Sequence, residues 1–286
     1  SLESVEIPDS VKEIGESAFS GCRNITSLKL PDSIEKLGYR SLCVMNKLKE
    51  LEIPGGVENS NCCCELEGMT TTIKFGEGIS EVCLSSSCAL TSYQSMVRRV
   101  ELPSTVTEFS DYKREELAHV RVVTLQTEKI PKNLLLAMTP EKRYKPKEYS
   151  YSFCEALKNE IYCIQTPERT ICIPSTVPEK SIQDINDTLN RIGAYIPANL
   201  FRYCKDTKQK LPMAFLEWQN SHDETTKKYL KRNRKKLVQD LIEEGMDEAL
   251  ARFFKTGIFE KKEMQDVYDI IAEANGMEMS KAYALD

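Results

Sequence analysis

Residues 2–22 read LESVEIPDSVKEIGESAFSGC, and this pattern returns twice before residue 58. The second copy is ITSLKLPDSIEKLG at residues 25–38, and the third is LKELEIPGGV at residues 48–57. Their prolines stand at positions 8, 31 and 54, so that 31 − 8 = 54 − 31 = 23. A repeat of this fixed length predicts a solenoid, in which each repeat forms one coil, and not a globule with a central fold.

The apolar residues of the first copy, Leu2, Val5 and Ile7, face one way, whereas Ser4 and Glu6 face the other. This alternation is typical of a β-strand with a single apolar face. One such strand cannot shield its apolar face alone, and stacking the coils buries a continuous core. The proline ends each strand because it cannot donate a hydrogen bond to the ladder. Successive coils are expected to advance by about 4.8 Å, the spacing of neighbouring strands.

The full pattern, Leu-x-x-Ile-x-Ile-Pro-x-Ser-Val-x-x-Ile-Gly-x-x-Ala-Phe-x-x-Cys, resembles the BspA-type leucine-rich repeat of bacterial proteins. The match is strong over residues 1–57 and looser over residues 58–204. The resemblance implies a right-handed leucine-rich solenoid that binds other molecules, often in surface antigens or adhesins. It does not imply an enzyme.

The later coils keep this period with local changes. In the fourth coil Gly76 takes the place of the proline, and its offset from Pro54 is 76 − 54 = 22. The offset to Pro103 of the fifth coil is 103 − 76 = 27, and this longer spacing predicts a surface loop within 85–96. The sixth coil, around Leu125, returns to the usual offset from the matching leucine of the fifth, 125 − 102 = 23.

The end of the solenoid is less regular. Two strand-like stretches, 161–164 and 171–177, begin close together, at an offset of 171 − 161 = 10, and they form either a hairpin or two faces of one coil. Residues 139–150 are polar and carry two prolines, so we expect an exposed loop there. Residues 191–204 resemble the closing turn of a last coil. We therefore expect the solenoid domain to span residues 1–206.

From about residue 207 the apolar period changes from 2 to 3.6, which predicts an all-α domain over 207–286. The residues from Asp247 return at Glu278 with an offset of 278 − 247 = 31, which weakly resembles the helix pairs of ankyrin-like repeats. The helices of this all-α domain are expected to cover the open end of the solenoid. The fold class is therefore α+β, with short parallel strands followed by helices. The expected helices are 211–219, 221–244 with a capping box at Ser221 and Glu224, 247–254, 261–274 and 278–286.

The outward strand positions form the candidate ligand-binding surface, because the resemblance implies that the sheet face holds the ligand. Repeat arrays commonly use such an extended surface to bind partners. These positions mix both signs of charge, and they are equally typical of solvated residues on a strand. The candidate residues are Glu6, Lys29, Glu50, Glu52, Lys74, Arg99, Glu101 and Thr124.

Residues 227–236 hold seven basic residues in ten, which gives an alternative function. One interpretation is binding to nucleic acid or another anionic polymer, with an affinity that falls as salt rises. The other is a solvated helix face, since acidic residues follow at 240, 243 and 244. No recognised DNA- or RNA-binding motif accompanies the run, so a protein or glycan partner is favoured. The candidate anion-binding residues are Lys231, Arg232, Arg234 and Lys235.

The sequence holds no recognisable catalytic or cofactor motif. Its two histidines, His119 and His222, have no Ser or Cys nucleophile beside them in a known motif. No Gly-x-Gly-x-x-Gly stretch or phosphate-binding Gly-Lys-Ser/Thr loop occurs. We therefore predict a non-catalytic binding module without a cofactor.

The 11 cysteines do not point to a metal site, because no Cys-x-x-Cys occurs and no histidine stands at ligand spacing from Cys62–Cys64 or Cys83. Cys22, Cys43 and Cys172 fall at repeat positions, where small core residues are expected. So many thiols favour a reducing, cytoplasmic compartment, whereas the resemblance implies the cell surface. The localisation therefore stays open.

The formal net charge of −5 is too small to indicate a class of partner. No run approaches 18 apolar residues, so no membrane span is expected. The chain begins inside a repeat and without Met, so a fragment of a longer protein is expected and no signal peptide is visible.

Overall fold

The computed structural model describes residues 2–57, 70–83, 97–110, 117, 119–139, 161–174, 177–191, 199–204 and 207–285. The chain divides into two compact units. The first comprises Ser1–Lys142, Tyr162–Ile171 and Val177–Ile192, and the second Arg143–Ile161, Cys172–Thr176 and Gly193–Asp286. The predicted domain boundary touches residue 206, which lies outside the described residues, and it stays a prediction.

Some predictions fall on residues outside these ranges. They are the loop within 85–96, all but the first residue of the loop at 139–150, the cysteines at 62–64, and the middle of the closing turn at 191–204. The predicted covering role of the C-terminal helices also stays a prediction.

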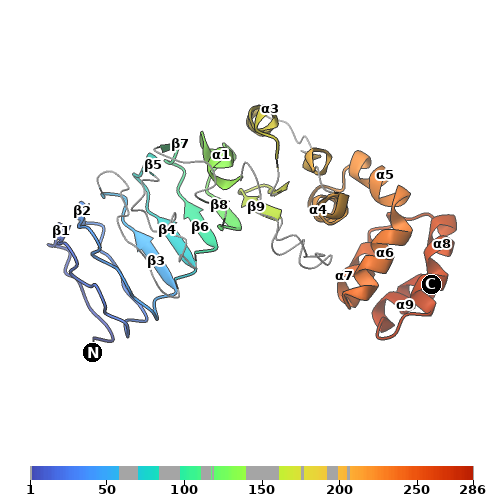
Figure 1. Ribbon diagram of the computed structural model, residues 1–286, viewed down its shortest axis with the longest axis horizontal. Helices are drawn as coiled ribbons and strands as arrows, with labels where there is room; N and C mark the ends of the chain where they lie inside the picture. Colours follow the sequence, from blue (N-terminus) through green and yellow to red (C-terminus); the bar gives the residue numbers. More distant parts are fainter. Residues whose placement is uncertain are drawn as a thin grey trace, which may run out of the picture. The chain divides into compact units, whose positions relative to one another are not determined.

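The first unit is a solenoid with a main sheet in the strand order β10-β9-β8-β6-β4-β3, although only the first two residues of β10 belong to this unit (Figure 1). Strands β3, β4, β6, β8 and β9 pair in parallel, each with the next. The predicted stack of short parallel strands is therefore confirmed. The strands are β3 (Glu50–Ile53), β4 (Thr72–Phe75), β6 (Arg99–Leu102), β8 (Val122–Leu125), β9 (Ile161–Gln165) and β10 (Thr170–Pro174).

The register of this ladder repeats the spacing expected from the sequence. Leu51 pairs with Ile73 (73 − 51 = 22), and Ile73 pairs with Val100 (100 − 73 = 27). Val100 pairs in turn with Val123 (123 − 100 = 23). All four side chains are at most 1% exposed. They form one apolar column inside the solenoid, to which each coil contributes one side chain.

Shorter strands pair on the return side of the coils. Strand β1 (Glu13–Ile14) pairs in parallel with β2 (Lys36–Leu37), and β5 (Glu81–Cys83) pairs in parallel with β7 (Glu108–Ser110). Their inward residues are buried, as Phe109 illustrates. A coil is thus closed by two rows of apolar side chains that face each other.

The first two coils do not join the main ladder, and the strands predicted at 2–7 and 25–30 are absent there. The second coil keeps the side-chain alternation, with Leu28 and Leu30 buried and Lys29 exposed. However, no backbone hydrogen bond joins residues 25–30 to residues 48–53, all of which are described. Alternate burial alone produces the sequence pattern, whereas a strand also needs a backbone partner at hydrogen-bonding distance.

Glycine is required where neighbouring coils turn close together. A Cβ atom on Gly38 would lie 2.5 Å from the backbone N of Glu16, and one on Gly55 would lie 1.6 Å from the carbonyl O of Glu77. These neighbours are backbone atoms, so they can move only with their coil. Gly15 of the first coil stands at the same repeat position as Gly38, and a Cβ atom on Gly15 would have no other atom within 4 Å.

The solenoid ends in a hairpin. The Thr166 N–H donates to the Arg169 carbonyl at 2.9 Å and closes the turn between β9 and β10. A connection this short allows only an antiparallel pair. Of the two alternatives left open by the sequence, the hairpin is therefore the correct one.

Helix α3 (Glu179–Asn190) follows the hairpin and packs on the short helix α1 (Leu134–Met138). This helix is absent from the elements expected from the sequence. Its buried residues Ile182, Ile185 and Leu189 are three and four positions apart, which is the helical signal that identifies it. The repeat that builds the earlier coils has no counterpart of this stretch.

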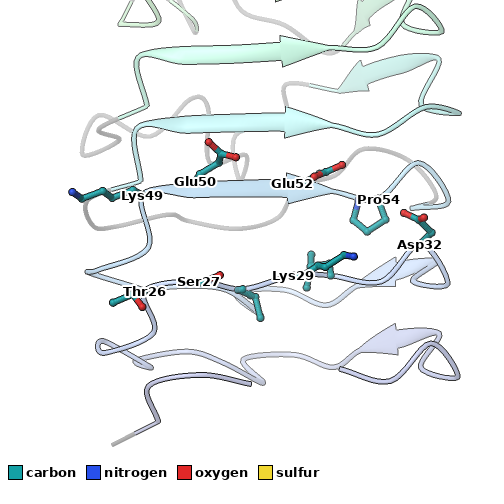
Figure 2. A pocket seen from close by; sticks show the side chains of 10 residues that line it. Thr26, Ser27, Lys29, Asp32, Lys49, Glu50, Glu52 and Pro54 are labelled. Atoms are coloured by element: carbon teal, nitrogen blue, oxygen red, sulfur yellow. The ribbon is translucent and has the colours of Figure 1, made fainter. Parts of the chain in front are cut away.

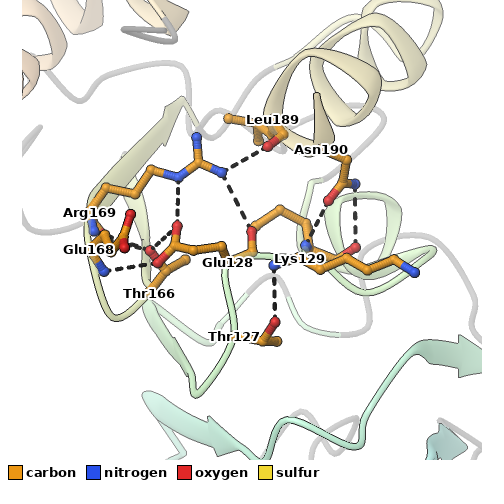
Figure 3. A network of polar contacts seen from close by, with 9 residues as sticks. Thr127, Glu128, Lys129, Thr166, Glu168, Arg169, Leu189 and Asn190 are labelled. Carbon is orange, nitrogen blue, oxygen red and sulfur yellow. Dashed lines mark hydrogen bonds and ion pairs between the residues drawn. The ribbon is translucent and has the colours of Figure 1, made fainter. Parts of the chain in front are cut away.

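A polar network joins the turn after β8, the hairpin and α3 (Figure 3). Arg169 donates from Nε to Glu128 Oε2 at 3.1 Å and from Nη2 to the Leu189 carbonyl at 2.8 Å. Glu128 also accepts from the Glu168 N–H at 2.8 Å and from Thr166 Oγ1 at 2.9 Å. One carboxylate thus ties together segments that are far apart in the sequence.

The second unit is helical, as predicted. Helix α6 packs on α8, and α7 packs on α9. Trp218, the single tryptophan, is buried on α4. The elements are the 3₁₀ helix η1 (Leu200–Tyr203) and the α-helices α4 (Thr207–Ser221), α5 (Glu224–Arg232), α6 (Arg234–Glu243), α7 (Asp247–Lys255), α8 (Lys261–Ala272) and α9 (Glu278–Leu285).

The single helix predicted over 221–244 is wrong, because it is two helices, α5 and α6, that meet at Asn233. Asp223 caps α5, and its Oδ2 accepts from the N–H groups of Thr225 at 2.9 Å and Thr226 at 3.0 Å. Asp is as strong an N-cap as Ser, so the sequence offered two caps within three residues. The Asn233 amide donates to the carbonyl of Tyr229 at 2.8 Å at the junction.

Asp247 and Glu278, which stand at the offset of 31, begin helices α7 and α9, and these two helices pack on each other. Asp247 begins α7, and its carboxylate accepts from the N–H groups of Met279 at 2.9 Å and Ser280 at 2.8 Å at the start of α9. Although burial would raise the pKa of Asp247, these bonds and that from the Ser280 hydroxyl lower it. The likeness to ankyrin repeats stays a prediction.

Gly38→Ala is expected to lower the thermal midpoint, because the new methyl group would push the first and second coils apart. Overpacking of this kind costs about 1–3 kcal/mol. Gly15→Ala is the matched control at the same repeat position, and it should leave stability unchanged or slightly raised, since no atom lies near and the unfolded chain loses freedom. Equal midpoints for the two variants in thermal unfolding would contradict this account of the coil corners.

Candidate functional site

Six of the eight predicted surface residues lie side by side on the outward face of the main sheet. In the register, Glu50 is level with Arg99 two strands away, and Glu52 is level with Lys74. Glu6 and Lys29 lie on the first two coils, which do not belong to the ladder. The six residues are Glu50 and Glu52 on β3, Lys74 on β4, Arg99 and Glu101 on β6, and Thr124 on β8.

Lys74 stands between two carboxylates of this face. Its Nζ lies 2.6 Å from Glu50 Oε1 and 3.8 Å from Glu101 Oε2. The hydrogen bond with Glu50 raises the pKa of Lys74, burial opposes this, and the charges of Glu101, Glu50 and Glu52 add to the rise. The lysine is therefore a fixed positive charge at neutral pH. Ion pairs this exposed contribute about 0–1 kcal/mol to stability, so the arrangement is available for recognition.

Arg99 is held by uncharged partners. Its Nη1 donates to Thr124 Oγ1 at 3.3 Å and to Gln165 Oε1 at 3.1 Å. The Thr124 hydroxyl also donates to Gln165 Oε1 at 3.2 Å. Gln165, on β9, is a surface residue that the sequence analysis does not name. Aligning the strand at 161–164 with the sixth coil would have found it.

A groove of about 470 Å³ opens on the same face, between the second coil and β3 (Figure 2). Lys29 of the second coil and Glu50 and Glu52 of β3 all line it, so three predicted surface residues share it. Ser27 and Asp32 also line it. None of its ten lining residues is a histidine or a cysteine, so it offers hydrogen bonds and charge but no nucleophile with an adjacent base.

The parts of the chain that the structure describes contain no group of three His, Cys, Asp or Glu side chains placed to hold a metal ion. The same residues include no helix that is both long and apolar enough to span a bilayer.

The alternative anion-binding residues are not equally available. Lys231 Nζ lies 2.8 Å from Glu260 Oε1 and 2.9 Å from Glu263 Oε2, and Arg234 pairs with Asp266. These acidic partners come from the start of α8, and not from the next turn as the sequence suggested. Arg232 and Lys235 remain exposed. Half of the predicted cluster is therefore engaged in holding α5 and α6 to α8.

His119 lies in the first unit. Burial, together with the charges of Arg98 and Arg121, lowers its pKa to about 4. It is therefore neutral at physiological pH. His222 lies exposed just after α4.

Glu217, on α4, is a buried carboxyl group that no sequence pattern singles out. It is 8% exposed, and its Oε1 accepts from the N–H groups of Leu200 at 2.6 Å and Phe201 at 3.2 Å. Burial raises the pKa of Glu217 to about 8, although the two backbone hydrogen bonds oppose this. The group joins the start of η1 to α4, which is a structural role.

Glu217 should make stability depend on pH. Its folded pKa of about 8 exceeds the ordinary 4.5, so the folded state binds the extra proton between these values. The free energy of unfolding should therefore fall as pH rises from 4.5 to 8, by up to about 5 kcal/mol. Glu217→Gln keeps the acceptor oxygen and removes the charge.

We expect the thermal midpoint of Glu217→Gln to exceed that of the wild type at pH 9 and to match it near pH 4. Thermal unfolding of both proteins across this range checks the expectation. Parallel curves for the two proteins would show that Glu217 does not titrate as described.

The family match agrees with the solenoid architecture. The family described as the BspA type leucine rich repeat region matches residues 1–116 in six copies. A leucine-rich repeat protein from Bacteroides ovatus ATCC 8483 is similar at 18% identity and a TM-score of 0.23, over 49% of this chain and 54% of that one. The chain thus spans about half the length of that protein. No curated protein matches. Residues 1–116 are therefore similar to the BspA-type leucine-rich repeat region.

Proposed function

We propose that the first unit is a non-catalytic interaction module that binds a partner protein on the outward face of β3, β4, β6 and β8. The observation that carries this proposal is the set of charged and polar side chains on that face, held in register by the buried column beneath. A leucine-rich repeat region suggests a module for protein interaction.

The charge pattern of the face favours a protein partner. Glu50, Lys74 and Glu101 alternate in sign across three neighbouring strands. Complementary charges on a partner surface would fix its register and reject wrong partners. Arg99 has its side chain oriented by Thr124 and Gln165 before binding, and Arg is enriched among residues that dominate binding energy.

The alternative, binding of an anionic polymer through α5 and α6, has weaker support. Lys231 and Arg234 already pair with carboxylates of α8, so a polymer would have to displace them. Adhesion at a bacterial surface is the setting that the family resemblance implies, and the proposal does not depend on it.

A photo-crosslinking residue placed at Thr72 of the intact protein is expected to trap the partner, because Thr72 lies between Glu50 and Arg99 in the register. The same residue at Lys36, on the return side, should not trap it. With the partner purified, the double variant Lys74→Glu/Arg99→Glu should weaken binding at least tenfold, which is about 1.4 kcal/mol.

Lys36→Glu is the control for charge reversal, since Lys36 is exposed and its ammonium pairs with Glu13 across the return strands. Its affinity for the partner should equal that of the wild type. If Lys36→Glu weakens binding as much as Lys74→Glu/Arg99→Glu does, or if neither variant weakens it, the strand face is not the binding surface.

A further inference from the structure

We propose that the open edge of β3 binds an extended peptide segment of a partner protein, which pairs with it as an additional strand. This inference rests on the proposed function, and it names the kind of partner and the way in which it is held.

The backbone hydrogen bonds of β3 show which of its groups point away from β4. The Lys49 carbonyl accepts from the Thr71 N–H at 2.8 Å, and the Ile53 carbonyl accepts from the Gly76 N–H at 2.8 Å. Residues 49, 51 and 53 therefore direct their backbone groups toward β4. Alternate residues of a strand bond to opposite sides, so Glu50 and Glu52 direct their N–H and C=O groups away from β4.

The other wall of the groove does not occupy these groups. β3 is the terminal strand of the main sheet, and residues 25–30 make no backbone hydrogen bond to it. The second and third coils approach each other instead at the corner after β3, where a Cβ atom on Gly56 would lie 3.2 Å from the Ile34 carbonyl. The groove of about 470 Å³ lies between the two coils.

A peptide backbone is the complement of such an edge. It offers donors and acceptors at every second position, about 6.6 Å along a strand, as the groups of Glu50 and Glu52 do. Peptide addition to an exposed sheet edge takes its affinity from these bonds and its specificity from alternate side chains. A sugar or a nucleic acid has no backbone donors and acceptors at this period.

The side chains of β3 indicate the composition of the peptide. Glu50 and Glu52 both line the groove, although their carboxylates lie on the side of β3 away from Ser27 and Lys29, and Lys49 points away from them (Figure 2). Residues directly opposite each other on paired strands interact, and opposite charges stabilise the pair. Glu52 makes no ion pair with any described residue, whereas Glu50 bonds to Lys74. We therefore expect Lys or Arg at alternate positions of the peptide, above all opposite Glu52.

The same charges argue against a second copy of this chain as the occupant. Two copies of β3 paired about a two-fold axis at Leu51 would place Glu50 of each directly opposite Glu52 of the other. Like charges at directly opposite positions destabilise a strand pair.

The test is amide hydrogen exchange by NMR on the intact protein, with a blocked seven-residue peptide of alternating Thr and Lys as the probe. In the free protein, the amides of Glu50 and Glu52 should exchange rapidly, while those of Leu51 and Ile53 are protected by the ladder. Saturating peptide should slow exchange at Glu50 and Glu52 at least tenfold. Slow exchange at both amides before peptide is added would overturn the proposal, because the edge would then be covered.

Three controls identify the mode of binding. A peptide N-methylated at the residues whose backbone bonds to β3 should no longer protect the amides of Glu50 and Glu52. A peptide N-methylated at the alternate residues, which do not bond to β3, should still protect them. A peptide of alternating Thr and Glu should not protect the wild type. Glu52→Lys should reverse the preference between the two peptides. Equal protection of the amides of Glu50 and Glu52 by the two methylated peptides would refute strand pairing.

The double variant Lys74→Glu/Arg99→Glu separates this inference from the proposed function. Its β3 edge is unchanged, so the Thr–Lys peptide should still protect the amides of Glu50 and Glu52. A partner protein that binds the strand face without slowing exchange at these two amides would leave the proposed function standing and contradict the edge site.

Discussion

The fold depends on the contact of one buried apolar side chain in each coil with its counterpart in the next. Leu51, Ile73, Val100 and Val123 form this column, and each is at most 1% exposed. Burial of such a side chain contributes about 1.5–3 kcal/mol, but only if a neighbouring coil covers it. No coil is stable alone for this reason, and the stability of the solenoid is shared between neighbours.

The same contact determines where binding residues lie. Because side chains alternate along a strand, fixing the inward column also fixes outward rows such as Glu52, Lys74 and Glu101. These residues are free to serve recognition, since exposed ion pairs add little to stability. The ladder stops at β3 on one side and at the β9–β10 hairpin on the other. β3 and β10 are therefore the two terminal strands of the main sheet.

Features with a local cause could be predicted from the sequence, and features that depend on distant partners could not. The uneven offsets between successive coils follow from the spacing of apolar residues, prolines and glycines, and the register confirms them. The missing bonds between the second coil and β3 could not be foreseen, because side-chain alternation is the same with or without them. The pairing of Lys231 on α5 with Glu260 at the start of α8 joins two different helices, beyond the reach of charge patterns within one helix.

The most direct test of the stacked column is NMR of the intact protein with labelled methyl groups, which detects pairs of methyls in close contact. The account predicts contacts from Leu51 to Ile73, from Ile73 to Val100 and from Val100 to Val123. It predicts none between Leu51 and Val123, which are three strand spacings apart, about 14 Å. A contact between Leu51 and Val123, or the loss of any of the three consecutive contacts, would contradict a stack of coils and indicate a compact globule.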